Sequence, residues 1–240
     1  MKTYAIISDI HSNLEALTVV LDYIEDLSPD IIISLGDIVG YGPNPKECLN
    51  LVEKKANIQI IGNWDYAVYK NEYAHFNEIP KESFFWTRDV LSDYEKKKLG
   101  SLPFYSIFPF SRSGENAMFV HGSPRSPLKD YVSPDLPSWT YTVFFEISND
   151  FTEIDFLFLG HTHKPLHIVV GRKHLFNPGS VGQPRDGDPR ASFMVFNIDE
   201  ETLNFDYELV RLEYDIQTTQ EKMKENGFNE FLINRLSKGL

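Results

Sequence analysis

Residues 4–11 read YAIISDIH, in which an apolar run is followed at once by Asp9 and His11. A short apolar run that contains β-branched residues predicts a buried strand. Carboxylate and imidazole side chains are common metal ligands, and here they come just after the predicted strand ends. The same arrangement, an apolar run followed by ligand-type residues, recurs along the chain. It therefore helps to predict both the fold and a candidate metal site.

Four further apolar runs have ligand-type residues directly behind them. The runs are Ile31–Leu35, Ile58–Ile61, Ala117–Val120 and Phe156–Leu159. The residues that follow them are, in order, Asp37, Asn63, His121, and the pair His161 and His163. In an open α/β sheet, ligands bind in a crevice beyond the carboxyl ends of the strands. We therefore expect these side chains to meet in one such crevice.

Helices are predicted between the strands. Leu14, Leu17, Leu21 and Ile24 recur at a spacing that places them on one helical face. A second helix is expected to begin near Asn44, because Pro45 follows it and proline is favoured in the first turn of a helix. This strand–helix alternation predicts an α/β fold with a mostly parallel sheet.

Any one of these polar residues has an ordinary interpretation. An aspartate after a strand is most often a turn or helix cap, and a lone histidine is usually a hydrogen-bonded surface or core residue. The shared placement of the whole set favours a metal site. Its nitrogen and oxygen ligands suit manganese, iron, zinc, cobalt or nickel, and they are too many for one catalytic zinc. Two divalent metal ions sharing a carboxylate would use them all.

The rest of the chain is predicted to complete a single domain over residues 1–240. Residues from about 64 to 109 are expected to form a mainly helical insertion over one edge of the site, with a capping box at Ser92 and Glu95. Residues 167–176 and 192–212 predict two antiparallel hairpins. The tail from 215 to 236 has helical spacing and is expected to pack against the body.

Composition excludes several classes of function. The chain has 240 residues and a net charge of −12, which makes long nucleic acids poor partners. Cys48 is the single cysteine, so no intrachain disulfide is possible. No apolar run reaches the roughly eighteen residues of a membrane span, and we expect a cytoplasmic protein without membrane contact. The sequence gives no indication of the oligomeric state.

The polar motifs resemble those of the calcineurin-like metallophosphoesterase family. That family has the pattern D-x-H, G-D, G-N-H-[DE], a lone His, and G-H-x-H. The matching stretches here are Asp9-Ile10-His11, Gly36-Asp37, Gly62-Asn63-Trp64-Asp65, His121-Gly122 and Gly160-His161-Thr162-His163. The resemblance extends from residue 3 to about residue 212, and the stretch from Asn177 to Arg185 is similar to one in small prokaryotic members.

The resemblance implies a four-layer α/β/β/α sandwich, in which two mixed β-sheets pack face to face with helices outside each. It also implies two metal ions bridged by Asp37. One ion would be held by Asp9, His11, Asp37 and His163, and the other by Asp37, Asn63, His121 and His161. Asp37, Asn63 and His121 would be the catalytic residues, and a hydroxide bound to the metals would attack phosphorus in line.

Two residues are candidates for substrate binding. Trp64 stands where the family usually has the histidine that helps to protonate the leaving oxygen, and it either contacts substrate or packs beneath the insertion. Arg185 either binds a phosphate or forms a surface ion pair with Asp186 or Asp188.

The sequence therefore predicts a phosphoesterase, and a small phosphodiester is the favoured substrate. A phosphomonoesterase that acts on proteins or nucleotides is the alternative within enzymes. A scaffold that keeps the fold without catalysis is the third possibility. Decayed ligand positions would indicate a scaffold, whereas every ligand of the family pattern is present here.

Overall fold

The computed structural model describes residues 1–73, 78–111, 114–148 and 152–240, which form two five-stranded sheets. The first sheet has the spatial order β10 (Phe205–Leu212), β9 (Ala191–Ile198), β1 (Lys2–Ile7), β2 (Ile31–Ser34) and β3 (Ile58–Gln59). The second has the order β4 (Tyr105–Pro109), β5 (Asn116–Val120), β6 (Phe156–Phe158), β8 (Lys173–Pro178) and β7 (Pro165–Val170). All five strands predicted from apolar runs are present.

Both sheets are mixed, which corrects the expectation of a mostly parallel sheet. β1, β2 and β3 run parallel, as do β5, β6 and β8. The two predicted hairpins, β7–β8 and β9–β10, each add an antiparallel edge, and β4 adds another. Short turns can join only antiparallel neighbours, so the hairpin connections fix this part of the topology.

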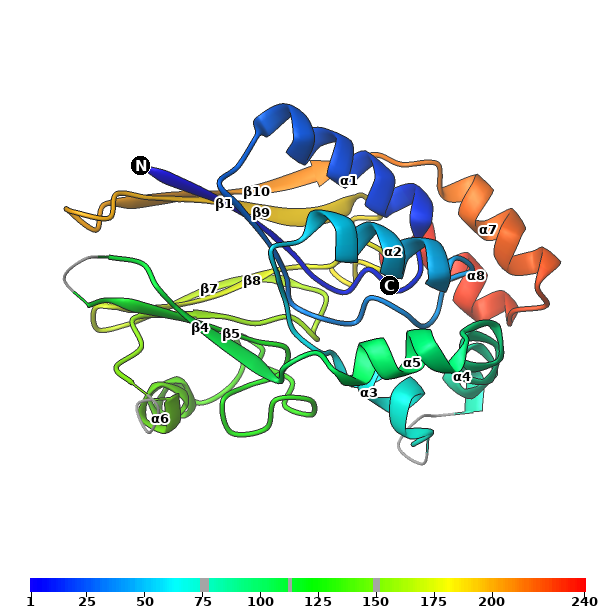
Figure 1. Ribbon diagram of the computed structural model, residues 1–240, viewed down its shortest axis with the longest axis horizontal. Helices are drawn as coiled ribbons and strands as arrows, with labels where there is room; N and C mark the ends of the chain where they lie inside the picture. The colour runs from blue at the N-terminus through cyan, green and yellow to red at the C-terminus, as the bar shows by residue number, and fades with distance from the viewer. Residues whose placement is uncertain (74–77, 112–113, 149–151) are drawn as a thin grey trace.

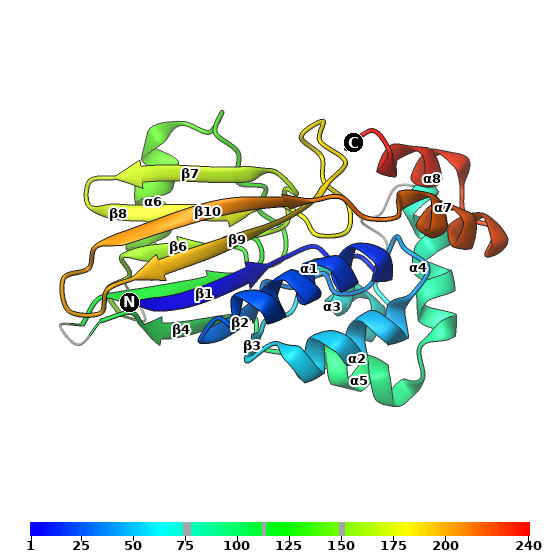
Figure 2. The ribbon, with the colours of Figure 1, turned by 90° about the horizontal axis from the view of Figure 1, so that it is seen from above.

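The helices of the described residues flank the sheets or gather at one end of the molecule. They are α1 (Leu14–Leu27), α2 (Pro45–Lys55), α3 (Asn63–Lys70), α4 (Glu78–Val90), α5 (Asp93–Gly100), α6 (Ser138–Ser148), α7 (Ile216–Glu225) and α8 (Glu230–Leu236). In Figure 1, α1 and α2 lie over the first sheet and α6 lies under the second. Figure 2 shows α4, α7 and α8 together at one end of the molecule.

Local sequence accounts for where several helices begin. Asn13 caps α1 through a hydrogen bond from the backbone N–H of Ala16. Pro45 occupies the first turn of α2, as predicted. The capping box predicted at Ser92 and Glu95 forms at the start of α5.

The predicted helical insertion is shorter than expected. Its helices α3, α4 and α5 end at Gly100, whereas Tyr105–Pro109 is strand β4 on the edge of the second sheet. One proline, Pro109, and the adjacent apolar pair Ile107 and Phe108 obscure the alternation within this stretch, and pairing with β5 makes it a strand. The predicted helical tail divides into α7 and α8, which bury Met223 and Leu232 against the body.

The core follows the four layers. One cluster of buried side chains lies between the first sheet and its helices, another between the sheets, and a third between the second sheet and α6. Aromatic rings dominate the middle cluster: the Phe158 ring centroid lies 5.2 Å from that of Phe176 and 5.3 Å from that of Phe196. No described helix is long and apolar enough to cross a membrane.

Phe158→Ala tests how far this middle layer holds the sheets together. Removing a fully buried ring from between two sheets is expected to lower the free energy of unfolding by about 3–5 kcal/mol. Chemical denaturation would measure the change. Trp139→Ala is a matched control, because Trp139 is 64% exposed on α6, and it should change stability far less. Equal effects of the two changes would contradict this description of the core.

Candidate metal centre

The predicted ligands meet at the carboxyl ends of the strands that precede them. Asp9 and His11 follow β1, and Asp37 follows β2. The loops after these two strands remain hydrogen-bonded to each other, because the His11 backbone N–H donates to the Asp37 carbonyl at 2.9 Å. Asn63 is the first residue of α3 and follows β3. His121 follows β5, and His161 and His163 follow β6.

Six of these side chains form two buried groups that could each hold a metal ion. The first group is Asp9, His11 and His163, and the second is Asp37, His121 and His161. Asn63 joins the second group through its Oδ1 atom, which lies 3.0 Å from His121 Nε2. The structure thus brings together the whole predicted ligand set.

Asp37 faces both groups. Its Oδ2 atom lies 3.6 Å from Nε2 of His11 and 3.4 Å from Nε2 of His121. Its other oxygen, Oδ1, accepts a hydrogen bond from the backbone N–H of Trp64 at 2.8 Å. This bond fixes the direction of the carboxylate and leaves Oδ2 free for the space between the groups.

Hydrogen bonds behind the histidines aim their Nε2 atoms into the site. Nδ1 of His121 donates to the Leu35 carbonyl at 2.7 Å, and Nδ1 of His163 donates to the Gln183 carbonyl at 2.5 Å. Nδ1 of His11 lies 3.3 Å from the Val39 carbonyl. Such partners set the tautomer of a metal-binding imidazole, so Nε2 is left to act as the ligand atom.

Several of these atoms are buried without a suitable partner. Among the residues that the structure describes, Asp9 Oδ1 and His161 Nε2 have no hydrogen-bond partner. Nε2 of His11 lies 3.1 Å from Nε2 of His163, which in turn lies 3.2 Å from Asp9 Oδ1. Lone pairs that face one another out of water are unfavourable, and a cation between them would remove the conflict. The donor set therefore fits divalent metal ions.

The charge state of the first group also suits a metal. Burial lowers the pKa of His11 well below its ordinary value, and it lowers the pKa of His163 as well. Burial acts to raise the pKa of Asp9, but the surrounding histidines, His163 foremost, lower it overall. An ionised carboxylate and neutral imidazoles are the forms that bind metals.

Five of the predicted ligands have left-handed backbone conformations. They are Asp9, His11, Asp37, His161 and His163, with φ between 48° and 68°. Residues other than glycine adopt this region at a cost, and such residues cluster at functional sites. Their backbones turn sharply at the strand ends, which directs consecutive ligands into the same space.

Asp65 is a residue of the site for which no role was predicted. Its carboxylate is fully buried and accepts backbone N–H groups from Ile38, Val39 and Gly62 at 3.0–3.3 Å. These bonds tie the loop that carries Asp37 to the start of α3. Burial, together with the nearby Asp37 carboxylate, raises the pKa of Asp65 to about 7. The sequence signal that could have identified Asp65 is its position in the matched motif Gly62-Asn63-Trp64-Asp65.

The two residues expected to contact substrate differ in their surroundings. Trp64 is only 3% exposed and packs against Tyr41, with ring centroids 4.3 Å apart. Arg185 is half-buried, donates to Oε1 of Gln183 and lies over the Tyr41 ring. The anticipated surface pairs involve other arginines, because Asp186 binds Arg211 and Asp188 binds Arg190.

Comparisons with known proteins show the family of this chain. A family model for the calcineurin-like phosphoesterase superfamily domain matches residues 1–201. The chain belongs to this superfamily.

Three relatives cover between 79% and 100% of the phosphoesterase. Uncharacterized protein MJ0912 of Methanocaldococcus jannaschii is 38% identical over 98% of this chain and 97% of its own. Phosphodiesterase YfcE of Escherichia coli is 27% identical over 79% of this chain and 85% of its own. The crystal structure of a metallophosphoesterase from Sphaerobacter thermophilus superposes with a TM-score of 0.82 at 36% identity, covering 100% and 99% of the two chains.

A second residue beside the site of the phosphoesterase was not anticipated. Tyr131, in the loop after β5, lays its ring 4.0 Å from that of His161, yet 60% of the residue is exposed. The sequence carries no signal for this contact, because Tyr131 lies ten residues beyond the nearest motif in an irregular segment.

His121 is predicted to make the affinity of this site for metal depend on pH. Burial alone would lower its pKa, but Asp37 reverses the effect and raises it to about 9. Both ring nitrogens face oxygen acceptors, as an imidazolium requires. The metal-free protein should therefore hold this proton at pH 7 and release it when metal binds.

We expect affinity for divalent metal to rise about tenfold per pH unit between pH 6.5 and 9, as for the release of one proton. Calorimetry in buffers of different ionisation enthalpy would count the protons. A raised pKa also means that His121 stabilises the metal-free fold below about pH 6.5, and that this contribution is lost as the pH rises through 9. Metal binding without proton release at pH 7.5 would contradict the assignment.

Proposed function

We propose that this protein is a phosphodiesterase that holds two divalent metal ions, with manganese expected first and iron, zinc, cobalt or nickel as alternatives. One ion would be held by Asp9, His11, Asp37 and His163, and the other by Asp37, Asn63, His121 and His161. The observation that carries the proposal is the pair of adjoining buried ligand groups, with Asp37 facing both. When bound, the ions supply positive charge for a phosphate and acidify a water for in-line attack on phosphorus.

The protein's own groups orient this chemistry. The Trp64 backbone N–H holds one oxygen of Asp37, so the other oxygen stays between the two groups. Asn63 and His121 lie together on the side of the second group, where a phosphate would approach. The guanidinium of Arg185 has no carboxylate partner among the described residues and is available to bind a phosphate oxygen.

A diester is favoured over a monoester for two reasons. The relative that carries a named activity, the YfcE protein of Escherichia coli, is a phosphodiesterase. Trp64 also removes the usual proton donor, which a dianionic monoester with a poor leaving group needs most. A scaffold role is disfavoured because all seven ligand side chains are in place. A small substrate and a cytoplasmic location belong to the proposal on the basis of composition.

Asp37→Asn is expected to lower hydrolysis of bis(p-nitrophenyl) phosphate by about a thousandfold or more, because the shared charge between the ions is lost. Elemental analysis after loading with manganese should fall from about two ions per chain toward one. Asp206→Asn is the control, since Asp206 binds Asn197 on the β9–β10 hairpin and touches no ligand. Near-normal turnover by the Asp37 variant would show that the bridge is misassigned.

The same assay with p-nitrophenyl phosphate separates a diesterase from a monoesterase. A higher kcat/KM for the diester supports the proposal, and a clear preference for the monoester would replace it with the alternative. Metal binding with little or no hydrolysis of either ester would support the catalytically weak, metal-binding scaffold.

Trp64 gives the proposal a second test. Without an imidazole at this position, rates should fall steeply as the leaving group becomes more basic, because general acid assistance is typically worth about a hundred- to ten-thousand-fold. Trp64→His should raise rates for alkyl leaving groups more than for aryl ones. Trp64→Phe keeps an aromatic ring and serves as the packing control. If both variants only lower the melting temperature, the indole is a packing residue, as its burial suggests.

A further inference from the structure

A cavity of about 320 Å³ opens beside the candidate metal centre. Asn63 and His161 form its inner end, so it adjoins the second ligand group. The other walls come from two parts of the chain that are far apart in sequence. Tyr66, Ala67 and Glu72 belong to α3 and the turn after it, and Leu128, Lys129 and Tyr131 belong to the loop after β5.

The geometry of α3 explains why this helix serves both the site and the cavity. Residues separated by three and four positions share a helical face, which places Asn63, Tyr66 and Ala67 in a row. Trp64 and Asp65 point away from that face and are buried in the body. This short helix therefore places the Asn63 carboxamide, next to the metal centre, on the same face as Tyr66 and Ala67, which line the cavity.

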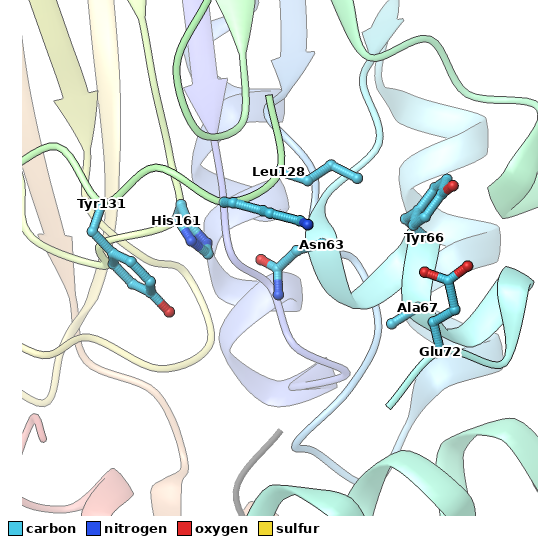
Figure 3. Close-up of a pocket in the computed structure, with 8 residues that line it drawn as sticks. Asn63, Tyr66, Ala67, Glu72, Leu128, Tyr131 and His161 are labelled. Atoms are coloured by element: carbon cyan, nitrogen blue, oxygen red, sulfur yellow. The ribbon is translucent and has the colours of Figure 1, made fainter. Parts of the chain in front are cut away.

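The walls suit a flat aromatic group. Figure 3 shows Tyr131 and Tyr66 on opposite sides of Asn63 and His161, and Leu128 and Ala67 also line the cavity. The Tyr131 ring packs at a tilt of 31° against the His161 ring, and the Tyr66 ring packs against Phe104 with centroids 5.7 Å apart. Both rings are thus held by neighbours while they border the cavity. Aromatic rings fixed in this way are platforms on which bases stack.

Size and charge narrow the class of ligand. A volume near 320 Å³ lies at the low end for ligand sites, so the cavity accepts one base or nucleoside rather than a polymer. Glu72 and Lys129 add one acceptor and one donor to the lining, and neither forms an ion pair among the described residues. A nucleobase edge offers the complementary amino and carbonyl groups.

We infer that this cavity binds the base of a nucleotide, so that the substrate is a nucleoside phosphodiester with its phosphate beside Asn63 and His161. The inference rests on the proposed function and adds to it the chemical class of one ester group. Recognition of the base would come from residues of α3 and of the loop after β5 that are not themselves metal ligands, such as Tyr66 and Tyr131.

The first experiment measures binding without turnover. Calorimetry on the manganese-loaded protein would compare adenosine 5′-monophosphate with methyl phosphate, which carries the same phosphate and no base. We expect the nucleotide to bind at least about tenfold more tightly, as for one base stacked on an aromatic side chain. Equal affinities for the two ligands would overturn the inference.

Variants on α3 supply the matched control. Tyr66→Ala should weaken nucleotide binding about tenfold and leave methyl phosphate unchanged, while Tyr66→Phe should retain most of the affinity. Tyr69→Ala removes a tyrosine of the same helix that does not line the cavity, and it should change neither affinity. A thermal melt of each variant would confirm folding. A loss in the Tyr69 variant that equals the loss in the Tyr66 variant would contradict the assignment.

Hydrolysis then separates this inference from the proposed function. The p-nitrophenyl ester of thymidine 5′-monophosphate should have a kcat/KM at least about tenfold above that of methyl p-nitrophenyl phosphate. If both esters react equally well, the protein is a phosphodiesterase and the base pocket is wrong. If neither ester reacts with any metal while nucleotide still binds, the proposed function fails and the pocket stands.

Discussion

The Asp37 carboxylate lies between two sets of buried ligand atoms, and the surrounding structure is arranged to hold it there. One of its oxygens is fixed by the Trp64 N–H, and the other lies within 3.6 Å of imidazole nitrogens on both sides. Asp65 reinforces this arrangement, because it gathers backbone N–H groups from the loop after β2 and from the start of α3. A carboxylate so constrained cannot turn away to relieve its contacts.

This arrangement is costly for the protein chain alone. Five ligands occupy left-handed backbone conformations, each unfavourable by roughly 1 kcal/mol or more. Buried oxygen and nitrogen lone pairs face one another without donors between them. The aromatic layer between the sheets and the hydrogen-bonded loops after β1 and β2 offset these unfavourable free energies. Bound cations would accept the facing lone pairs as ligands and so remove their repulsion.

Helix α3 links the metal centre to recognition. Its first residue, Asn63, belongs to the ligand set, its buried residues brace Asp37, and its outward residues line the cavity in Figure 3. A substitution on this helix can therefore change metal binding, stability or substrate preference, depending on which side it faces. Tyr66 and Trp64 are only two positions apart and lie on different sides.

The sequence by itself determined the strands, the ligand positions behind them and several helix starts. These features depend on local periodicity, on caps within one turn, and on motifs a few residues long. It also anticipated the face-to-face layers through the resemblance carried by those motifs. Only the tertiary structure decided that Tyr105–Pro109 is a strand, that Arg185 lies over Tyr41, and that Tyr131 packs against His161. Such contacts join residues distant in sequence, and their geometry follows from how whole elements pack, which no local pattern records.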